Sequence, residues 1–208
     1  MMIFYLSSFK FGNQIEMLKE WIKKYNNKIL LIINALDAKD EFKIKKNIEE
    51  DTKILTEIGF DVKLVDLKEY FNRKESLKKY FDQYNAICVM GGNVFILRQA
   101  MNLSGLDEFL KEKLSNDEFL YIGYSAGSCV LSPSLSELDI VDEPISFYKN
   151  SNIIYDGLGI LDYLIIPHYK STYHKSHLID EIVAQCQNKN INFKTLKDGE
   201  VITIKLNR

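Results

Sequence analysis

The chain has 208 residues, of which 46% are hydrophobic and 27% charged, and its formal net charge at pH 7 is −2. This size suits one compact α/β domain over residues 1–208, with no second domain expected. The near balance of charge argues against a nucleic-acid partner or an anionic membrane partner. No apolar run is long enough to span a bilayer, and the apolar start lacks the basic leader of a secretory signal.

The chain has three cysteines, Cys88, Cys129 and Cys186. They are odd in number, widely spaced and embedded in apolar sequence. This pattern favours reduced core thiols over a disulfide framework. We therefore expect a cytoplasmic protein.

Short apolar runs alternate with amphipathic stretches, which indicates a largely parallel sheet with helices on both faces. Strands are predicted at 3–6, 28–34, 62–65, 86–90, 119–122 and 163–166. Helices are predicted at 14–25, 94–102, 106–114 and 177–186. A further helix carries apolar residues at helical spacing from Ile44 to Ile58 and ends at Gly59. The predicted fold class is a three-layer, doubly wound α/β fold.

The last apolar runs, 193–196 and 201–206, flank a Lys-Asp-Gly turn at 197–199. Turn residues between two such runs are typical of a hairpin, so we predict a terminal β-hairpin.

The stretch 123–127 reads Gly-Tyr-Ser-Ala-Gly between an apolar strand and an apolar helix-compatible run. This is the pattern of a nucleophile elbow, in which a sharp turn exposes the serine hydroxyl. Flanking glycines are needed because side chains there would clash with the strand and the helix. Ser125 is therefore the candidate nucleophile; the alternative is that Ser125 is an ordinary helix N-cap.

A serine hydroxyl needs a base to take its proton and a carboxylate to orient that base. Of the three histidines, His168 follows a predicted strand and is expected at its carboxyl end, where open α/β sheets place their sites. His168 is thus the strongest candidate base, and a structural histidine is the alternative. A zinc site of His168, His174 and His177 is conceivable but lacks a supporting metal motif, so we expect no metal and no cofactor.

A glycine-rich turn, Met90-Gly91-Gly92-Asn93, follows a predicted strand and opens a predicted helix. The amide of Gly91 or Gly92 and that of Ala126 are candidate donors for an oxyanion hole. A phosphate-binding turn is the weaker interpretation, because neither Gly-x-Gly-x-x-Gly nor a Walker pattern is present.

Four blocks recur in the order and near the spacing of one known family: 91–95, 121–128 with Pro133 shortly after, 166–169 and 196–200. The chain from about residue 86 onward thereby resembles the dipeptidase E and cyanophycinase-like serine peptidases, whose fold is similar to class I glutamine amidotransferases. The resemblance implies Ser125 as nucleophile, His168 as general base, and Gly91 or Gly92 with Ala126 as oxyanion donors.

The family pattern implies a third triad member between the serine and the histidine. Asp139 is our first choice, and Glu137 and Asp142 are rivals that a shift of two or three residues would promote. Any of the three could instead be plain surface charge.

The resemblance also implies a cation near the histidine that reads an N-terminal aspartyl residue. Lys170 and Lys175 follow His168 closely, with no arginine among them, and lysine lacks the bidentate fork, so aspartyl selectivity stays open. We expect a metal-independent serine peptidase of small peptides, monomeric or homodimeric. An esterase-type serine hydrolase and a non-catalytic small-molecule-binding relative are the alternatives.

Overall fold

The computed structural model describes residues 1–208 except 26, 117, 173–174 and 207–208. The strands are β1 (Met2–Ser7), β2 (Lys28–Ile32), β3 (Asp61–Val65), β4 (Ala86–Val89), β5 (Phe119–Tyr124), β6 (Leu164–Ile166), β7 (Phe193–Thr195) and β8 (Val201–Leu206). The α-helices are α1 (Ile15–Tyr25), α2 (Glu41–Ile58), α3 (Lys74–Phe81), α4 (Val94–Ser104), α5 (Leu106–Asn116), α6 (Ala126–Cys129) and α7 (Ser176–Asn188). Short 3-10 turns lie at η1 (Asn34–Leu36), η2 (Leu67–Tyr70) and η3 (Ser136–Ile140).

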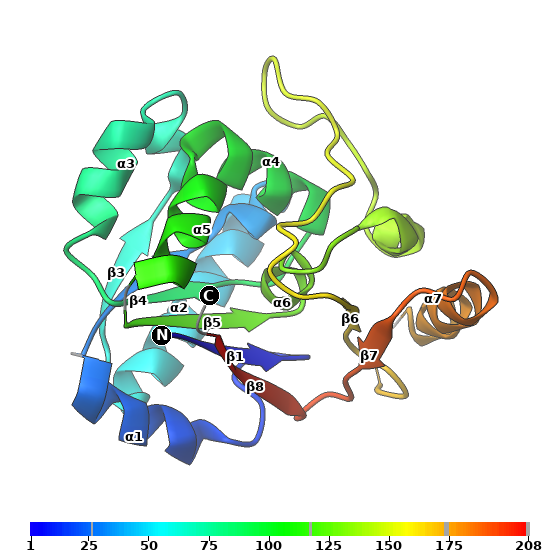
Figure 1. Ribbon diagram of the computed structural model, residues 1–208, viewed down its shortest axis with the longest axis horizontal. Coiled ribbons are helices and arrows are strands. Elements are labelled where there is room, and N and C mark those ends of the chain that lie inside the picture. The colour runs from blue at the N-terminus through cyan, green and yellow to red at the C-terminus, as the bar shows by residue number, and fades with distance from the viewer. Residues whose placement is uncertain (26, 117, 173–174, 207–208) are drawn as a thin grey trace.

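The main sheet has six strands in the order β3-β2-β4-β5-β1-β8, and a second sheet pairs β6 with β7 (Figure 1). The neighbours among β3, β2, β4, β5 and β1 are parallel, whereas β8 runs antiparallel to β1. The mostly parallel α/β architecture is therefore confirmed.

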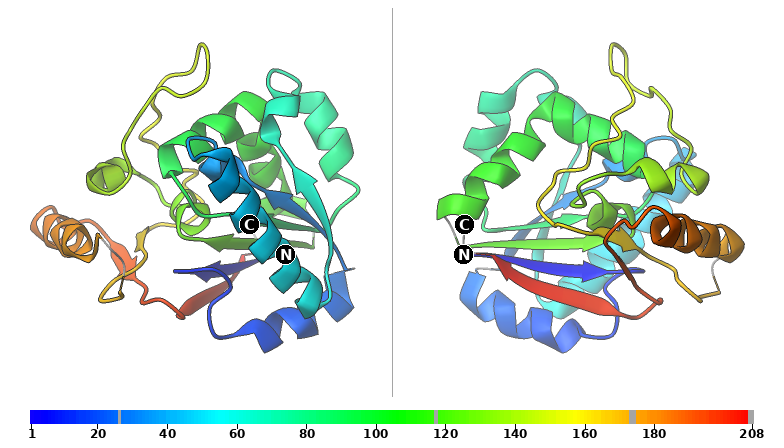
Figure 2. Two further views of the ribbon diagram at one scale, coloured as in Figure 1. Left: turned by 180° about the vertical axis from the view of Figure 1, so that it is seen from behind. Right: turned by 45° about the vertical axis from the view of Figure 1, so that its right-hand side comes forward.

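Alternate side chains of the main sheet point to opposite faces, as the period of a strand requires. Phe4 packs on one face, in the core beneath α3, α4 and α5, while Tyr5 packs on the other, in the core with α1 and α2. Figure 2 shows these helices on the two sides of the sheet. The three layers expected from the sequence are present.

Helix α2 shows how local sequence sets these elements. The Asp40 side chain accepts a hydrogen bond from the Lys43 N–H, which caps the start of the helix. At the other end, Gly59 adopts a left-handed conformation with φ of 118°, as a glycine C-cap does. The predicted end of this helix at Gly59 is confirmed.

The predicted terminal hairpin is wrong. β7 pairs in parallel with β6, and β8 pairs with β1 across the main sheet. Backbone hydrogen bonding explains the difference. β8 pairs with β1, whose outer N–H and C=O groups would otherwise lie unpaired at the edge of the main sheet. The segment between β7 and β8 therefore crosses from one sheet to the other.

Two further observations bear on the predictions from composition. Cys88, Cys129 and Cys186 are buried free thiols. Among the helices of the described residues, none is both long and apolar enough to cross a bilayer.

Candidate active site

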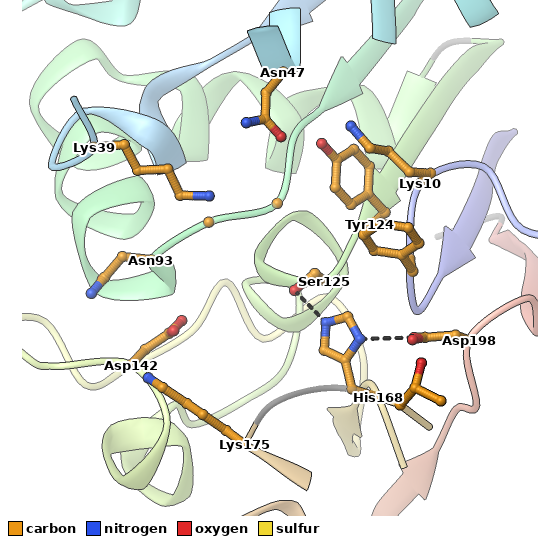
Figure 3. A pocket seen from close by; sticks show the side chains of 14 residues that line it. Lys10, Lys39, Asn47, Asn93, Tyr124, Ser125, Asp142, His168, Lys175 and Asp198 are labelled. Atoms are coloured by element: carbon orange, nitrogen blue, oxygen red, sulfur yellow. Dashed lines mark hydrogen bonds and ion pairs between the residues drawn. The ribbon is translucent and has the colours of Figure 1, made fainter. Parts of the chain in front are cut away.

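A pocket of about 630 Å³ opens where the carboxyl ends of β1, β4 and β5 meet (Figure 3). Segments that follow these strands contribute Phe9, Gly92 and Ser125 to its wall, and the loop after β6 contributes His168. Parallel strands end at the same edge of a sheet, so residues distant in the sequence converge there.

Ser125 lies on a sharp turn between β5 and α6, with φ of 49° and ψ of −118°. Side chains cannot be tolerated at the two flanking glycines. A Cβ on Gly123 would lie 2.5 Å from the carbonyl oxygen of Gly127, and one on Gly127 would lie 2.2 Å from that of Val89. The close approach of strand and helix therefore accounts for the glycines of the predicted elbow.

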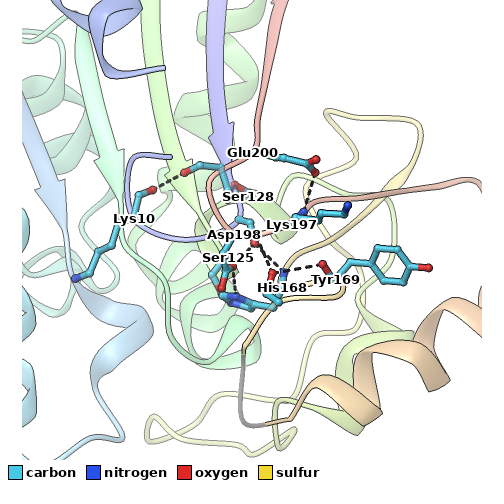
Figure 4. A network of polar contacts seen from close by, with 11 residues as sticks. Lys10, Ser125, Ser128, His168, Tyr169, Lys197, Asp198 and Glu200 are labelled. Carbon is cyan, nitrogen blue, oxygen red and sulfur yellow. Dashed lines mark hydrogen bonds and ion pairs between the residues drawn. The ribbon is translucent and has the colours of Figure 1, made fainter. Parts of the chain in front are cut away.

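Ser125, His168 and Asp198 form a continuous polar chain (Figure 4). The His168 Nε2 atom lies 3.3 Å from the Ser125 Oγ atom, and its Nδ1 atom lies 2.8 Å from the Asp198 Oδ1 atom. His168 is buried, at 8% exposure, so the ring is held between its two partners. The arrangement has the order nucleophile, imidazole, carboxylate that activates a serine.

The parallel pairing of β6 and β7 explains why Asp198 reaches His168. Ile166 pairs with Thr195, so the residues that follow the two strands leave the second sheet side by side. The Tyr169 N–H donates to the Leu196 carbonyl at 3.0 Å, which continues this pairing past the strands.

Ser8, directly after β1, joins both members of the pair. Its hydroxyl donates to the Asp198 Oδ1 atom at 2.8 Å and accepts the His168 backbone N–H at 2.7 Å. The Asp198 N–H also donates to the Ser171 hydroxyl at 2.8 Å. These bonds attach the second sheet to the end of β1 and fix the carboxylate beside the imidazole.

Asp198 occupies the position that we expected Asp139 to fill, and this corrects the prediction. Asp139 is exposed on η3, and Glu137, although buried, lies 3.4 Å from the Lys189 ammonium. The third candidate, Asp142, lines the pocket and accepts the Val94 N–H at 2.8 Å. The loop after α6 thus runs along α4 and α7, whereas the carboxylate at His168 comes from the segment after β7.

Asp142 has an unusual electrostatic environment. Burial raises its pKa from 3.8 to about 6, although the Val94 N–H, Lys175 and Lys39 oppose the rise. A carboxylate in such a site is costly to ionise, because the charge loses water.

The three candidate oxyanion donors lie around Ser125. Gly91 and Gly92 line the pocket, and a Cβ on Gly91 would lie 3.0 Å from that of Ser125. Gly92 has a φ of 154°, and a Cβ there would meet the Ala35 carbonyl oxygen at 2.1 Å, so only glycine fits. Within the described part of the chain, the Gly92 and Ala126 amides donate to no backbone carbonyl.

Two residues that line the pocket, Lys10 and Tyr124, share the fully buried carboxylate of Asp51. The Lys10 ammonium lies 2.6 Å from its Oδ1 atom, and the Tyr124 hydroxyl donates to its Oδ2 atom at 2.7 Å. Burial, with the charge of Asp51, raises the Tyr124 pKa well above its usual value, and the Gly91 backbone opposes that rise. The network fixes the residue that precedes Ser125.

Within the described residues, the structure does not bring together the histidines that we considered for a zinc site. His177 lies on α7, His174 lies outside the described residues, and both ring nitrogens of His168 face Ser125 and Asp198. Among the described residues, no three His, Cys, Asp or Glu side chains are grouped to hold a metal ion.

A serine on a sharp turn beside a buried imidazole, at the carboxyl edge of a three-layer α/β fold, is the type of site found in serine hydrolases. The model of Peptidase family S51 matches residues 5–207, so the chain belongs to that family and is a serine peptidase. The predicted resemblance to dipeptidase E-like peptidases is confirmed.

Individual relatives agree with this assignment. The peptidase Lin0382 of Listeria innocua is 26% identical over 203 residues, which are 98% of this chain and 92% of that protein. Peptidase E of Nostoc sp. PCC 7120 is 30% identical over 132 residues, 62% of this chain and 48% of that protein.

Two crystal structures share the fold. A Listeria monocytogenes EGD-e protein assigned to peptidase E has a TM-score of 0.75 and 24% identity, with 99% of each chain covered. A peptidase from an acI-B1 Actinobacterium has a TM-score of 0.71 and 15% identity, over 98% of this chain and 83% of that one.

Proposed function

We propose that this peptidase hydrolyses dipeptides and other small peptides through Ser125, His168 and Asp198, by way of an acyl-enzyme. The observation that carries the proposal is the unbroken contact chain from the Ser125 hydroxyl through His168 to the Asp198 carboxylate. A separation of 3.3 Å between the Ser125 Oγ atom and the His168 Nε2 atom is within the range of ligand-free sites, which tighten when substrate binds.

In the proposed mechanism, the Nε2 atom of His168 takes the Ser125 proton as Oγ attacks the peptide carbonyl. Asp198 accepts the Nδ1–H of His168, which selects the tautomer with a free Nε2 and stabilises the imidazolium. His168 then protonates the leaving amine, and the C–N bond breaks. Water repeats the sequence on the ester, which releases the acid and restores Ser125.

The oxyanion of each tetrahedral intermediate requires backbone donors directed at one point. Ala126 supplies one, because its amide follows the nucleophile at the start of α6. Of the two glycines, Gly92 is the better second donor, since the backbone of Gly91 interacts with Tyr124.

The pocket favours a short peptide over an uncharged ester. Besides the triad, its wall carries ammonium groups from Lys10, Lys39 and Lys175 and the carboxylate of Asp142. Small peptides are zwitterions, so charges of both signs within one pocket match their two ends.

The test is release of free amino acids from a dipeptide library that includes Asp-X and Lys-X members, with a chelator present. Wild type, Ser125→Ala and His168→Ala are compared after circular dichroism has established that the variants fold. We expect chelator-insensitive release by the wild type and a loss of at least about 10³-fold in each variant. Equal release by wild type and Ser125→Ala would refute the proposed nucleophile. Release of alcohol from esters without dipeptide cleavage would favour the esterase alternative.

A further inference from the structure

Lys39 lies between η1 and α2, and its side chain extends into the pocket on the side away from His168 (Figure 3). Lys39 is exposed, and desolvation by the surrounding protein together with the nearby charge of Lys10 lowers the pKa of its ammonium. Both effects disfavour the ammonium form. The pocket wall therefore carries an ammonium group that a ligand can reach.

The other two pocket lysines already have partners. The Lys10 ammonium lies 2.6 Å from Asp51 and 3.4 Å from Glu50, and the Lys175 ammonium donates to the Val141 carbonyl. Among the described residues, the Lys39 ammonium has no ion pair or hydrogen bond. Lys39 thus differs from its neighbours in being available to a ligand.

The carboxylates of the pocket do not neutralise Lys39. Asp198 is engaged by His168 and Ser8. Asp142 acts on Lys39 only through its charge, and it bonds the Val94 N–H. An anion from outside the protein can accept a hydrogen bond from the Lys39 ammonium, and a hydrogen bond between two charged groups is stronger than one between neutral groups.

We propose that Lys39 binds a carboxylate of the peptide substrate and so determines which peptides the site accepts. This inference rests on the proposed function for the identity of the ligand. A peptide can supply the carboxylate from its C-terminus or from an acidic side chain. Binding of the first kind would restrict the enzyme to short peptides, since a longer chain would carry its terminus past the pocket.

The experiment uses four compounds that separate the two sources: Asp-Leu, Asn-Leu and the C-terminal amide of each. Their kcat/KM values are measured with the wild type, Lys39→Met and Lys39→Arg. We expect Lys39→Met to lower kcat/KM on the order of 10- to 100-fold for the compounds that carry the recognised carboxylate, chiefly through KM. For compounds that lack this carboxylate, Lys39→Met should lower kcat/KM by less than about threefold. Lys39→Arg should retain most of the activity because the charge remains.

Lys43→Met is the matched control. Lys43 is exposed on the first turn of α2, where its ammonium lies 3.0 Å from Asp40. The Lys43→Met substitution removes the same charge close to Lys39 without changing the pocket wall. The selectivity of this variant among the four compounds should therefore match that of the wild type. A change as large as that of Lys39→Met would mean that only the overall field of the protein matters, and would overturn the proposal.

A binding measurement tests the proposal without requiring that the compounds be hydrolysed. Calorimetric titration of the four compounds into Ser125→Ala and into Ser125→Ala/Lys39→Met measures the same preference without reaction. If the wild type cleaves none of them, the proposed function fails for this class, while a carboxylate preference lost with Lys39 still supports the inference. Equal binding of all four compounds, or no binding to Ser125→Ala, overturns it.

Discussion

Asp198 and Asp139 offer a direct test at the residue scale, because each is a candidate for the acid that orients His168. Asp198 lies 2.8 Å from the Nδ1 atom, whereas Asp139 is exposed on η3. An amide in place of Asp198 keeps the shape but removes the charge, and it allows the wrong imidazole tautomer. We expect Asp198→Asn to lower kcat on the order of 10³- to 10⁴-fold, and Asp139→Asn to leave it within about twofold. Steady-state kinetics on one dipeptide is sufficient.

The reverse result would restore the original prediction from sequence. Loss of activity in Asp139→Asn, with little change in Asp198→Asn, would require the loop after α6 to rearrange when substrate binds. Similar far-ultraviolet circular dichroism of the two variants is the necessary control.

The carboxylate of Asp142 makes stability depend on pH. Its folded pKa, raised from 3.8 to about 6 by burial, means that the folded chain favours the protonated form. The contribution of protonated Asp142 to the free energy of unfolding is therefore full below pH ~3.8 and is lost as pH rises through ~6. Asp142→Asn retains an acceptor for the Val94 N–H but cannot ionise. We expect its free energy of unfolding, relative to the wild type, to increase by about 1–3 kcal/mol between pH 4 and pH 8.

Urea unfolding at the two pH values measures this difference. Asp139→Asn, which changes an exposed carboxylate in the same loop, is the matched control. A relative stability of Asp142→Asn that falls with pH would show that the carboxylate is stabilised as an ion in the folded protein, and a flat one would show that folding leaves its pKa unchanged.

At the scale of elements, substitutions at two glycines in left-handed conformations distinguish an effect on stability from an effect on activity. Gly59 ends α2 with φ of 118°, and Gly199 follows Asp198 with φ of 94°. A Cβ would meet only Ile22, at 3.6 Å, in the first case and nothing within 4 Å in the second. The cost of alanine at each is therefore backbone strain, about 1–2 kcal/mol in the free energy of unfolding.

Only Gly199→Ala changes the turn that carries Asp198, the carboxylate of the proposed triad. We expect both variants to lower the unfolding midpoint in urea similarly, while Gly199→Ala alone reduces kcat, by about tenfold or more, since small displacements of a triad group are costly. Equal kcat values for the two variants would mean that Ser8 and Ser171 hold Asp198 in place without help from the turn.

The same segment shows where prediction from sequence succeeds and where it stops. Hydrophobic periodicity and cap residues are local signals, so the helix that ends at Gly59 and the strand, sharp turn and helix around Ser125 were predictable. The pairing of β7 with β6 is not local: Phe193 meets Leu164, and the intervening chain contains the whole of α7. A Lys-Asp-Gly turn between two apolar runs favours a hairpin on local grounds. That interpretation placed Asp198 in a hairpin turn, so it was not considered as a partner of His168. Parallel pairing of 193–195 with the strand before His168 was the signal that would have revealed it.

At the scale of the whole molecule, the two sheets share one hydrophobic core. The core on the α4 and α5 side of the main sheet includes Ile165 from β6, Ile182 from α7 and Leu196 after β7, together with Val130 and Phe4. Ser8 adds polar links from β1 to His168 and Asp198. The proposed triad is therefore divided between the sheets, with Ser125 following a strand of the first and the other two members following strands of the second, but the packing beneath it is continuous.

This continuity predicts that residues 1–208 unfold as one cooperative unit. Trp21, the single tryptophan, lies on α1 against the opposite face of the main sheet, with its ring 6.1 Å from that of Tyr5. Its fluorescence therefore reports the layer most remote from the second sheet, whereas peptidase activity reports contact between the two sheets. Because burial of one shared core stabilises both, we expect fluorescence and activity to be lost with coincident midpoints in urea. Loss of activity at clearly lower urea, while the Trp21 signal stays native, would mean that β6, β7 and α7 detach first, so that the chain would have to be treated as two folding units joined at the active site.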